Sequence, residues 1–247
     1  MRAAVLAGGL GTRLRPYTTV LPKPLVPVGD RPILELILGW LARSGVDRVD
    51  VCIGHLGELI QTYFSQAQTI PAGLEVNWVW EHESLGTAGA LRGIPKLEET
   101  LLVVNGDILT DLDPAGMLAF HREQGAALTI ATRETTVATE LGVIEHSDGV
   151  VTGYREKPVL RYDASMGIYL YEPRAIAVLS PTPLQFPDLV LALLARGERV
   201  MAFVTDAEWH DVGTLAQHGE ATRVLENSPA NYPPAPRSGI DWGPNRA

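Results

Sequence analysis

The sequence predicts an α/β fold in which a mixed, mostly parallel sheet carries helices on both of its faces. Short apolar runs at 3–7 and 101–104 have the length and composition of strands that are buried on both sides. Segments with helical spacing, such as 33–41, alternate with such runs through the first 131 residues. That alternation is typical of parallel strands joined by crossover helices.

The predicted elements follow one another closely along the chain. In the first half, strands are expected at 3–7, 49–53, 74–80, 101–104 and 127–131, and helices at 33–41, 58–65 and 114–123. In the second half, a hairpin is expected at 142–154, strands at 165–171 and 200–204, and helices at 173–179, 188–196 and 215–226. We expect this second half to form a smaller, mixed-sheet lobe that covers the first.

These patterns predict one domain at 1–227, with parts at 1–131 and 132–227, followed by a tail at 228–247. The tail contains many prolines and shows little periodicity. We therefore expect an extended segment that is ordered only where it lies on the body or on a neighbouring subunit.

Composition excludes several classes of protein. The 247-residue chain has a net charge of −9, so neither a nucleic-acid surface nor an anionic-membrane surface is expected. Cys52 is the only cysteine, which excludes an internal disulfide and fits a reducing compartment. The chain begins directly with a predicted strand, without the pattern of a signal peptide, and its most apolar helix is too short to span a bilayer. We expect a cytoplasmic protein.

The stretch 1–30 is the strongest functional signal. Its predicted strand leads into the glycine cluster at 8–11, Arg13 follows, and Lys23 stands between two prolines. Glycines let backbone N–H groups approach a ligand closely, and arginine and lysine supply cations, so the stretch offers what a polyphosphate needs. The loops after the third and fourth strands should lie beside it, because ligands bind beyond the carboxyl ends of parallel strands. We expect a nucleoside triphosphate site there.

Two common phosphate-binding motifs fit this loop poorly. A dinucleotide-binding fingerprint would need a glycine where Leu14 stands, and an acidic strand end about twenty residues further on. A Walker A loop would need Gly-Lys followed by Ser or Thr, and none closes the loop. A dinucleotide-dependent oxidoreductase is therefore disfavoured. A plain βα turn with surface arginines would leave the Pro-Lys-Pro segment unexplained.

Five segments, in order, resemble the motifs of the sugar-1-phosphate nucleotidylyltransferase family. They are 6–16 (LAGGLGTRLRP) with 22–25 (PKPL), 83–89 (ESLGTAG), 105–107 (NGD), 156–158 (EKP) and 209–214 (WHDVGT). The second segment is most similar to the mannose-1-phosphate guanylyltransferase branch. The resemblance implies a Rossmann-like, GT-A-like nucleotidyltransferase fold, in which 1–131 binds the nucleotide and 132–227 binds the sugar phosphate in a smaller β lobe.

The family joins a nucleoside triphosphate to a sugar 1-phosphate, giving a nucleotide-sugar and pyrophosphate. The attacking phosphate oxygen is already ionised at neutral pH, so no general base or nucleophilic side chain is needed. By resemblance, Arg13 and Lys23 would bind phosphates, and Asp107 and Asp211 would hold Mg²⁺. Catalysis by these four residues would consist of positioning and electrostatic stabilisation. A turn cap for Asp107 and a helix N-terminal acid for Asp211 are the structural alternatives.

The resemblance also implies two sets of binding residues. The nucleotide would contact Leu6, Ala7, Gly8, Gly9, Gly11, Thr12, Arg13, Glu83, Leu85, Gly86, Thr87 and Gly106. The sugar phosphate would contact Gly142, Glu156, Lys157, Ser165 and Gly167. The expected partners are an NTP and a sugar 1-phosphate. A homo-oligomer, dimer or tetramer, is left open.

Two expectations concern specificity. Guanine presents two adjacent donors, which suit a carboxylate or backbone carbonyls, and 83–89 resembles the guanylyltransferase branch, so GTP is favoured over the thymidylyl, uridylyl, cytidylyl and adenylyl alternatives. Where the family commonly has Asn-Ala-Gly, this chain has Ser165-Met166-Gly167, so its sugar pocket should differ. This departure argues against mannose 1-phosphate and leaves open a heptose, a deoxysugar or a cyclitol phosphate. A catalytically silent nucleotide-sugar-binding regulatory subunit is the non-enzyme alternative, which the intact motifs disfavour.

Overall fold

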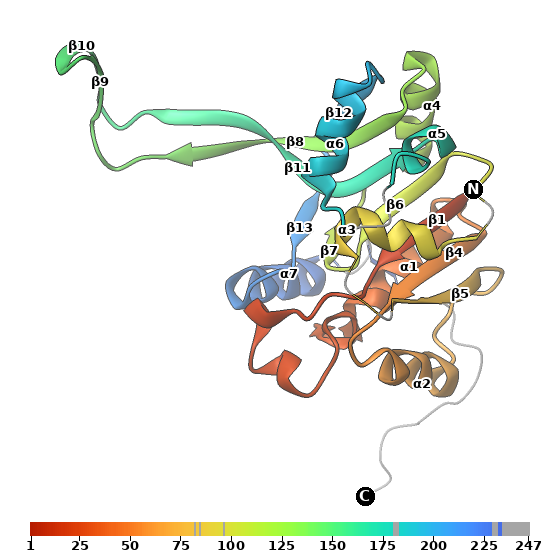
Figure 1. Ribbon diagram of the computed structural model, residues 1–247. Helices are drawn as coiled ribbons and strands as arrows, with labels where there is room; N and C mark the ends of the chain where they lie inside the picture. Colours follow the sequence, from red (N-terminus) through yellow and green to blue (C-terminus); the bar gives the residue numbers. More distant parts are fainter. Residues whose placement is uncertain (82, 84, 96, 180–182, 229–231, 234–247) are drawn as a thin grey trace, which may run out of the picture.

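A seven-stranded sheet forms the centre of the molecule. The computed structural model describes residues 1–81, 83, 85–95, 97–179, 183–228 and 232–233. The strand order is β12 (Val200–Val204), β8 (Leu128–Ala138), β11 (Val159–Tyr171), β6 (Leu101–Asn105), β1 (Arg2–Leu6), β4 (Arg48–Ile53), β5 (Glu75–Trp80) (Figure 1). Strand β11 is antiparallel to both of its neighbours, and all other neighbouring pairs are parallel. The predicted mixed, mostly parallel sheet is confirmed.

Helices cover both faces of this sheet, as the alternation along β1 requires. Ala3 and Val5 belong to one apolar cluster and Ala4 to the other, because successive side chains of a strand point to opposite faces. The first cluster includes residues of α1 (Ile33–Arg43), α2 (Gly57–Ala67), α4 (Pro114–Gln124) and α7 (Leu215–Asn227). The second includes residues of α3 (Gly86–Gly89), α5 (Pro173–Ile176) and α6 (Phe186–Ala195). Within the described residues, no helix combines the length and apolar character needed to cross a bilayer.

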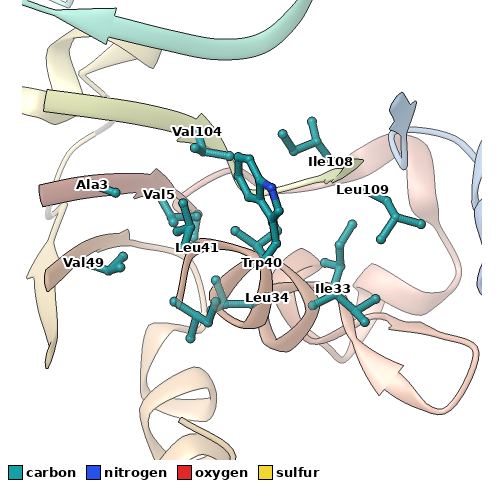
Figure 2. Packing of buried hydrophobic residues seen from close by; sticks show 14 of the residues in the cluster. Ala3, Val5, Ile33, Leu34, Trp40, Leu41, Val49, Val104, Ile108 and Leu109 are labelled. Atoms are coloured by element: carbon teal, nitrogen blue, oxygen red, sulfur yellow. The ribbon is translucent and has the colours of Figure 1, made fainter. Parts of the chain in front are cut away.

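Helix α1 provides the largest block of this core. Its apolar residues recur at helical spacing and face β1, β4 and β6 (Figure 2). The indole of Trp40 is buried with them, and its Nε1 donates to the carbonyl oxygen of Leu112 at 3.0 Å. The interaction ties α1 to the segment that follows β6.

Shorter elements complete the described chain. They are β2 (Pro27–Val28), β3 (Arg31–Pro32), β7 (Ile108–Thr110), β13 (Trp209–Asp211) and the one-turn helices η1 (Thr12–Leu14), η2 (Tyr17–Thr19), η3 (Lys23–Leu25) and η4 (Ala90–Gly93). Strands β7 and β13 pair antiparallel. Their pairing joins the segment after β6 to the segment before α7, which are distant in sequence.

The second half differs from its expected shape. Strands β8 and β11 are longer than predicted, and beyond the sheet they continue as a two-stranded ribbon that ends in the hairpin β9 (Val143–Ser147) and β10 (Val150–Arg155) (Figure 1). We call residues 133–164 the arm. It projects away from the body, so this half extends the sheet and does not cover the first half. The extensions were missed although residues 160–163 alternate apolar and charged side chains, which is the period of a half-exposed strand.

The expected tail lies mostly outside the described residues. Of its described part, Tyr232 is buried in the core. Its carbonyl oxygen accepts from Arg31 at 2.6 Å, and its hydroxyl donates to Glu208 at 3.0 Å. The chain after α7 therefore returns to the body at this point.

A buried ion pair joins the first strand to its neighbour. Arg2 Nε lies 2.7 Å from Asp50 Oδ2, and both side chains are almost inaccessible to water. We expect Asp50→Ala to lower the free energy of unfolding by about 3 kcal/mol, because it removes the carboxylate that pairs with a buried guanidinium. Denaturant unfolding measures this.

The exposed pair of Arg48 and Glu75 provides the control. Glu75→Ala should change stability by no more than about 0.5 kcal/mol. Replacing Arg2 and Asp50 together by Met and Leu should recover most of the loss, since no buried charge then remains. An Asp50→Ala loss as small as that of Glu75→Ala would contradict this account.

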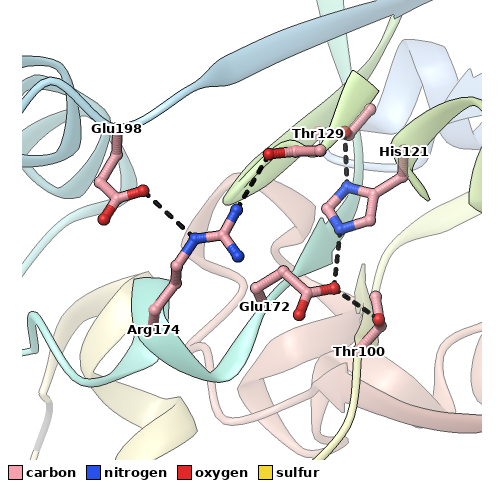
Figure 3. Close-up of polar contacts among 7 residues, drawn as sticks. Thr100, His121, Thr129, Glu172, Arg174 and Glu198 are labelled. Atoms are coloured by element: carbon pink, nitrogen blue, oxygen red, sulfur yellow. Dashed lines mark hydrogen bonds and ion pairs between the residues drawn. The ribbon is translucent and has the colours of Figure 1, made fainter. Parts of the chain in front are cut away.

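A polar network around His121 links α4 to the sheet. His121 lies with Nδ1 2.7 Å from the Thr129 hydroxyl and Nε2 3.1 Å from Glu172, which also accepts from Thr100 at 2.6 Å (Figure 3). Burial lowers the pKa of His121 below its ordinary value of 6.5, although Glu172 raises it. Burial alone would raise the pKa of Glu172, but the hydrogen bonds from Thr100 and His121 hold it below its ordinary value.

This network predicts a loss of stability in mild acid. Below the ordinary histidine pKa of 6.5, the unfolded chain takes up a proton that folded His121 resists, so stability falls as pH decreases. The slope contributed by one proton is at most about 1.4 kcal/mol per pH unit. Between pH 7.5 and pH 5.5, we expect the unfolding temperature of His121→Gln to vary less than that of the wild type. An equally steep decline in the variant would assign the effect to another group.

Candidate active site

A cavity of about 690 Å³ opens at the carboxyl ends of β1, β4, β5 and β6. Of the predicted nucleotide and catalytic residues, its wall contains 6–9, 11–13, Lys23, Glu83, Gly86, Thr87, Gly106 and Asp107. It also contains residues that were not predicted: Leu10, Pro24, Gly54, His55, Glu81, Ala90, Asn105, Gln185 and Gly213. Its size suits a small organic ligand.

The glycine loop takes a shape that other residues would disturb. Gly11 has a φ of +61°, and a Cβ there would lie 2.9 Å from the Cβ of Lys23 and from Cγ2 of Thr18. Thr18 closes the loop by donating its hydroxyl to the carbonyl oxygen of Gly11 at 2.8 Å. The close packing of Gly11 on the stem of Lys23 brings the glycine loop and the Pro-Lys-Pro segment together on one side of the cavity.

Opposite charges meet at the next strand end. The ammonium group of Lys23 forms an ion pair with Asp107, which follows β6. Strand pairing sets Asp211 opposite Ile108, and the amide of Val212 donates to the carbonyl oxygen of Asp107 at 2.7 Å. The two predicted metal aspartates, which are far apart in sequence, therefore lie at neighbouring backbone positions.

Asp211 is half-buried among charged side chains. Its Oδ1 is buried and has no hydrogen-bond partner. Burial raises the pKa of this carboxyl, and the charge of Asp107 raises it further, whereas Lys23 and Arg13 lower it. Among the described residues, no three His, Cys, Asp or Glu side chains cluster as a metal site. Two carboxylates are nevertheless enough for Mg²⁺, which keeps waters and substrate oxygens as its other ligands. The donor set fits that ion.

The other side of the cavity is held by contacts that the sequence did not reveal. The amides of Ala88 and Leu184 donate to the carbonyl oxygens of Leu184 and Leu85, at 3.1 and 2.8 Å respectively. The hydroxyl of Thr87 accepts from the amide of Phe186 at 3.0 Å. These bonds bring Gln185, at the start of α6, to the cavity wall.

Gly54, His55 and Glu81 also belong to the wall and were missed. They come directly after β4 and β5, so the rule that ligands bind at strand ends could have found them. Burial raises the pKa of Glu81. Its Oε1 would lie 2.8 Å from a Cβ at Gly8, so glycine there leaves room for this carboxylate.

Ser165 and Gly167 lie beside the cavity, at an irregularity in the pairing of β11 with β8. Gly167 has a φ of +74°, and a Cβ there would be 2.6 Å from Nδ2 of Asn105, which lines the cavity. The hydroxyls of Ser165 and Tyr169 lie 3.5 Å apart. Ser165 thus lies two residues before Gly167, which packs on the cavity wall.

Three predicted sugar-phosphate residues lie elsewhere. Gly142, Glu156 and Lys157 are on the arm, and none of them lines the cavity. There, Gly142 packs against the hydroxyl of Tyr154, which donates to Glu156 at 2.7 Å. Lys157 is exposed and has a φ of +42°. The body of the chain thus gathers the nucleotide and metal residues without these three.

The family model described as "Nucleotidyl transferase" matches residues 2–228, which include every motif discussed above. The chain belongs to the nucleotidyl transferase family. The resemblance found in the sequence is confirmed, and members of the family generally depend on a divalent metal.

Relatives within the nucleotidyl transferase family differ in the nucleotide that they are named for. A UTP–glucose-1-phosphate uridylyltransferase from Synechocystis is 34% identical over 90% of this chain and 63% of its own length. A D-glycero-alpha-D-manno-heptose 1-phosphate guanylyltransferase from Aneurinibacillus thermoaerophilus is 29% identical over 92% of this chain and 99% of its own length. Relatives named as mannose-1-phosphate guanyltransferases also match, at 30% identity.

A solved structure of the same kind supports the fold. HddC from Yersinia pseudotuberculosis has a TM-score of 0.72 at 25% identity, and the alignment covers 91% of this chain and 99% of that one. This chain thus spans the full length of some nucleotidyl transferase family members, and less than two thirds of the Synechocystis relative.

Proposed function

We propose that this chain transfers a nucleotidyl group from a nucleoside triphosphate to a sugar 1-phosphate or a sugar-like cyclitol 1-phosphate. One observation carries the proposal. Lys23 and Asp107 line the cavity together with the glycine loop, and Asp211, whose buried oxygen lacks a partner, lies next to Asp107 without lining the cavity. Cations and carboxylates arranged in this way suit a phosphoryl-transfer site that uses a divalent metal.

The reaction needs positioning more than acid–base chemistry. An oxygen of the sugar phosphate attacks the α-phosphorus, a new P–O bond forms, and the bond from the α-phosphorus to the bridging β-phosphate oxygen breaks. The bonding electrons leave with pyrophosphate. Backbone groups of 8–11 and the charges of Arg13 and Lys23 would hold the triphosphate and stabilise the leaving group. No proton has to be removed from the nucleophile.

Asp107 and Asp211 would hold Mg²⁺. When bound, the ion would neutralise charge on the reacting phosphates. The unpartnered oxygen of Asp211 and the raised pKa of its carboxyl support this assignment, because a cation would satisfy both.

GTP is the donor that we favour. Glu83 offers a carboxylate at the cavity wall, and guanine presents two adjacent donors that suit it. The guanylyltransferase from Aneurinibacillus supports this choice, since it matches along nearly its whole length. UTP is the second candidate, supported by the Synechocystis relative. Serine at 165, beside the cavity rim, supports an acceptor other than mannose 1-phosphate, such as a heptose, deoxysugar or cyclitol phosphate.

A matrix of five nucleoside triphosphates against sugar and cyclitol 1-phosphates, read by pyrophosphate release with Mg²⁺, tests the proposal. We expect release that requires both substrates, with GTP giving the highest kcat/KM. Higher kcat/KM with UTP would overturn the choice of base. Binding of nucleotide-sugar without turnover anywhere in the matrix would instead support a silent regulatory subunit.

A further inference from the structure

The arm holds a concentration of apolar surface. Of the seventeen large apolar side chains that are exposed in the described part of the chain, nine lie between residues 137 and 162. They are Val137, Leu141, Ile144, Val150, Val151, Tyr154, Val159, Leu160 and Tyr162. Together they expose on the order of several hundred Å² of apolar surface, which for a single patch marks an interaction site.

In the ribbon part of the arm, three of these side chains, Val137, Leu160 and Tyr162, share one face, and Val159 lies on the other. Val137 pairs with Leu160, and Thr135 pairs with Tyr162, so the four share a face. The intervening pairs lie on the opposite face, where Arg161 bonds Glu134 at 3.0 Å. The ribbon therefore has one mainly apolar face and one mainly polar face, as strand pairs have when one face packs on another surface.

A two-stranded ribbon of this kind is not self-sufficient. Isolated pairs of strands are marginally stable in water, and they need a third strand or a packed face. Here, the apolar face of the ribbon is exposed along the arm, which projects from the body (Figure 1). Something outside this single chain must cover that face.

The same arm carries Glu156 and Lys157, which are separated from the cavity. Ser165, at the rim, comes eight residues after Lys157, and at about 3.3 Å per strand residue this is roughly 26 Å along the ribbon. Within the described cavity wall, Arg13 and Lys23 are the Arg and Lys side chains, and the proposed function assigns both to the triphosphate. A second anionic substrate would thus lack a cation of its own.

We propose that two copies of this chain exchange arms, so that the apolar face of each arm packs on the partner and Lys157 enters the partner's cavity. The assignment of Lys157 to the acceptor phosphate rests on the proposed function. A second copy is the occupant that the geometry favours, because a two-fold exchange covers both arms, completes both sites and closes without exposing further surface. Burying both arms approaches the area of a standard interface, about 800 Å² per partner.

Sedimentation velocity across micromolar concentrations tests the exchange without substrate. We expect the wild type to be a dimer and Val137→Glu, on the apolar face, to weaken dimerisation by at least about tenfold. The matched control is Thr136→Glu, an exposed neighbour on the polar face, which should leave the dimer intact. Because both side chains are exposed in a single chain, a difference between the variants reports the interface. A monomeric wild type, or equal effects of the two changes, would overturn the proposal.

Mixing two inactive variants tests the shared site. Asp107→Asn damages the cavity and Lys157→Ala damages the arm, so a mixed dimer keeps one cavity and one arm that are both intact. After co-refolding in equal amounts, we expect about one quarter of wild-type turnover. Turnover no higher than the sum of the separate variants would show that each arm serves its own chain. The control mixture, Asp107→Asn with the double variant Asp107→Asn/Lys157→Ala, should stay inactive.

The two tests separate the inference from the function on which it rests. A dimer that releases no pyrophosphate with any substrate pair would refute the proposed function and leave the exchange standing. An active monomer would refute the exchange alone.

Discussion

Replacing Asp211 by Asn is expected to reduce turnover by about 10³-fold, because one of the two carboxylates for the metal is lost. The same change should leave the unfolding temperature equal or higher. Burial and the nearby charge of Asp107 raise the pKa of Asp211. Ionisation of this carboxyl therefore destabilises the folded protein, and the destabilisation grows as pH rises from the ordinary aspartate pKa to the raised pKa of Asp211. An amide removes that destabilisation.

Two measurements check this pairing of effects. Pyrophosphate release gives the loss of turnover, and thermal unfolding without metal gives the change in stability. Adding Mg²⁺ and GTP should raise the unfolding temperature of the wild type more than that of Asp211→Asn. The matched control is Asp206→Asn, since Asp206 is exposed and lies outside the cavity wall. A clear fall in unfolding temperature for Asp211→Asn would mean that the carboxylate supports the fold.

Lys23→Met is expected to reduce kcat by about 10²-fold to 10³-fold, because a cation at the reaction centre is lost. It should also move the acid limb of the pH profile to higher pH. Burial and Asp107 raise the pKa of Asp211, and Lys23 is one of the two cations that lower it, so removing Lys23 lets the pKa rise further. Asp211 must be ionised to hold a metal.

Lys23→Arg should recover little of this activity. The stem of Lys23 packs on Gly11, and its compact ammonium group contacts Asp107, a position that suits a point charge better than a planar guanidinium. Arg15→Met is the control, because Arg15 is an exposed cation of the same loop that does not line the cavity. Equal losses of kcat for Lys23→Met and Arg15→Met would show that Lys23 acts only through its positive charge and not through its position in the cavity.

The sequence by itself determined that a mostly parallel sheet forms and where its short buried strands end. Buried strands such as β1 and β6 have short apolar runs, and the loops at their carboxyl ends must meet at one edge because the strands are parallel. The glycine loop, Lys23 and Asp107 could be placed for that reason. Glu81 and His55 also follow the ends of parallel strands, so the same rule could have predicted them.

Only the tertiary structure decided the remaining features, because they depend on contacts between distant segments. Gln185 reaches the wall through backbone bonds between Leu85 and Leu184, which have no local sequence signal. Asp211 gains its environment by the pairing of β13 with β7. The hairpin at the tip of the arm was predicted, but the ribbon that carries it was not, because its direction is set by the sheet from which it extends. The sequence thus identified the family, and the structure separated Glu156 and Lys157, on the arm, from the predicted nucleotide residues that line the cavity.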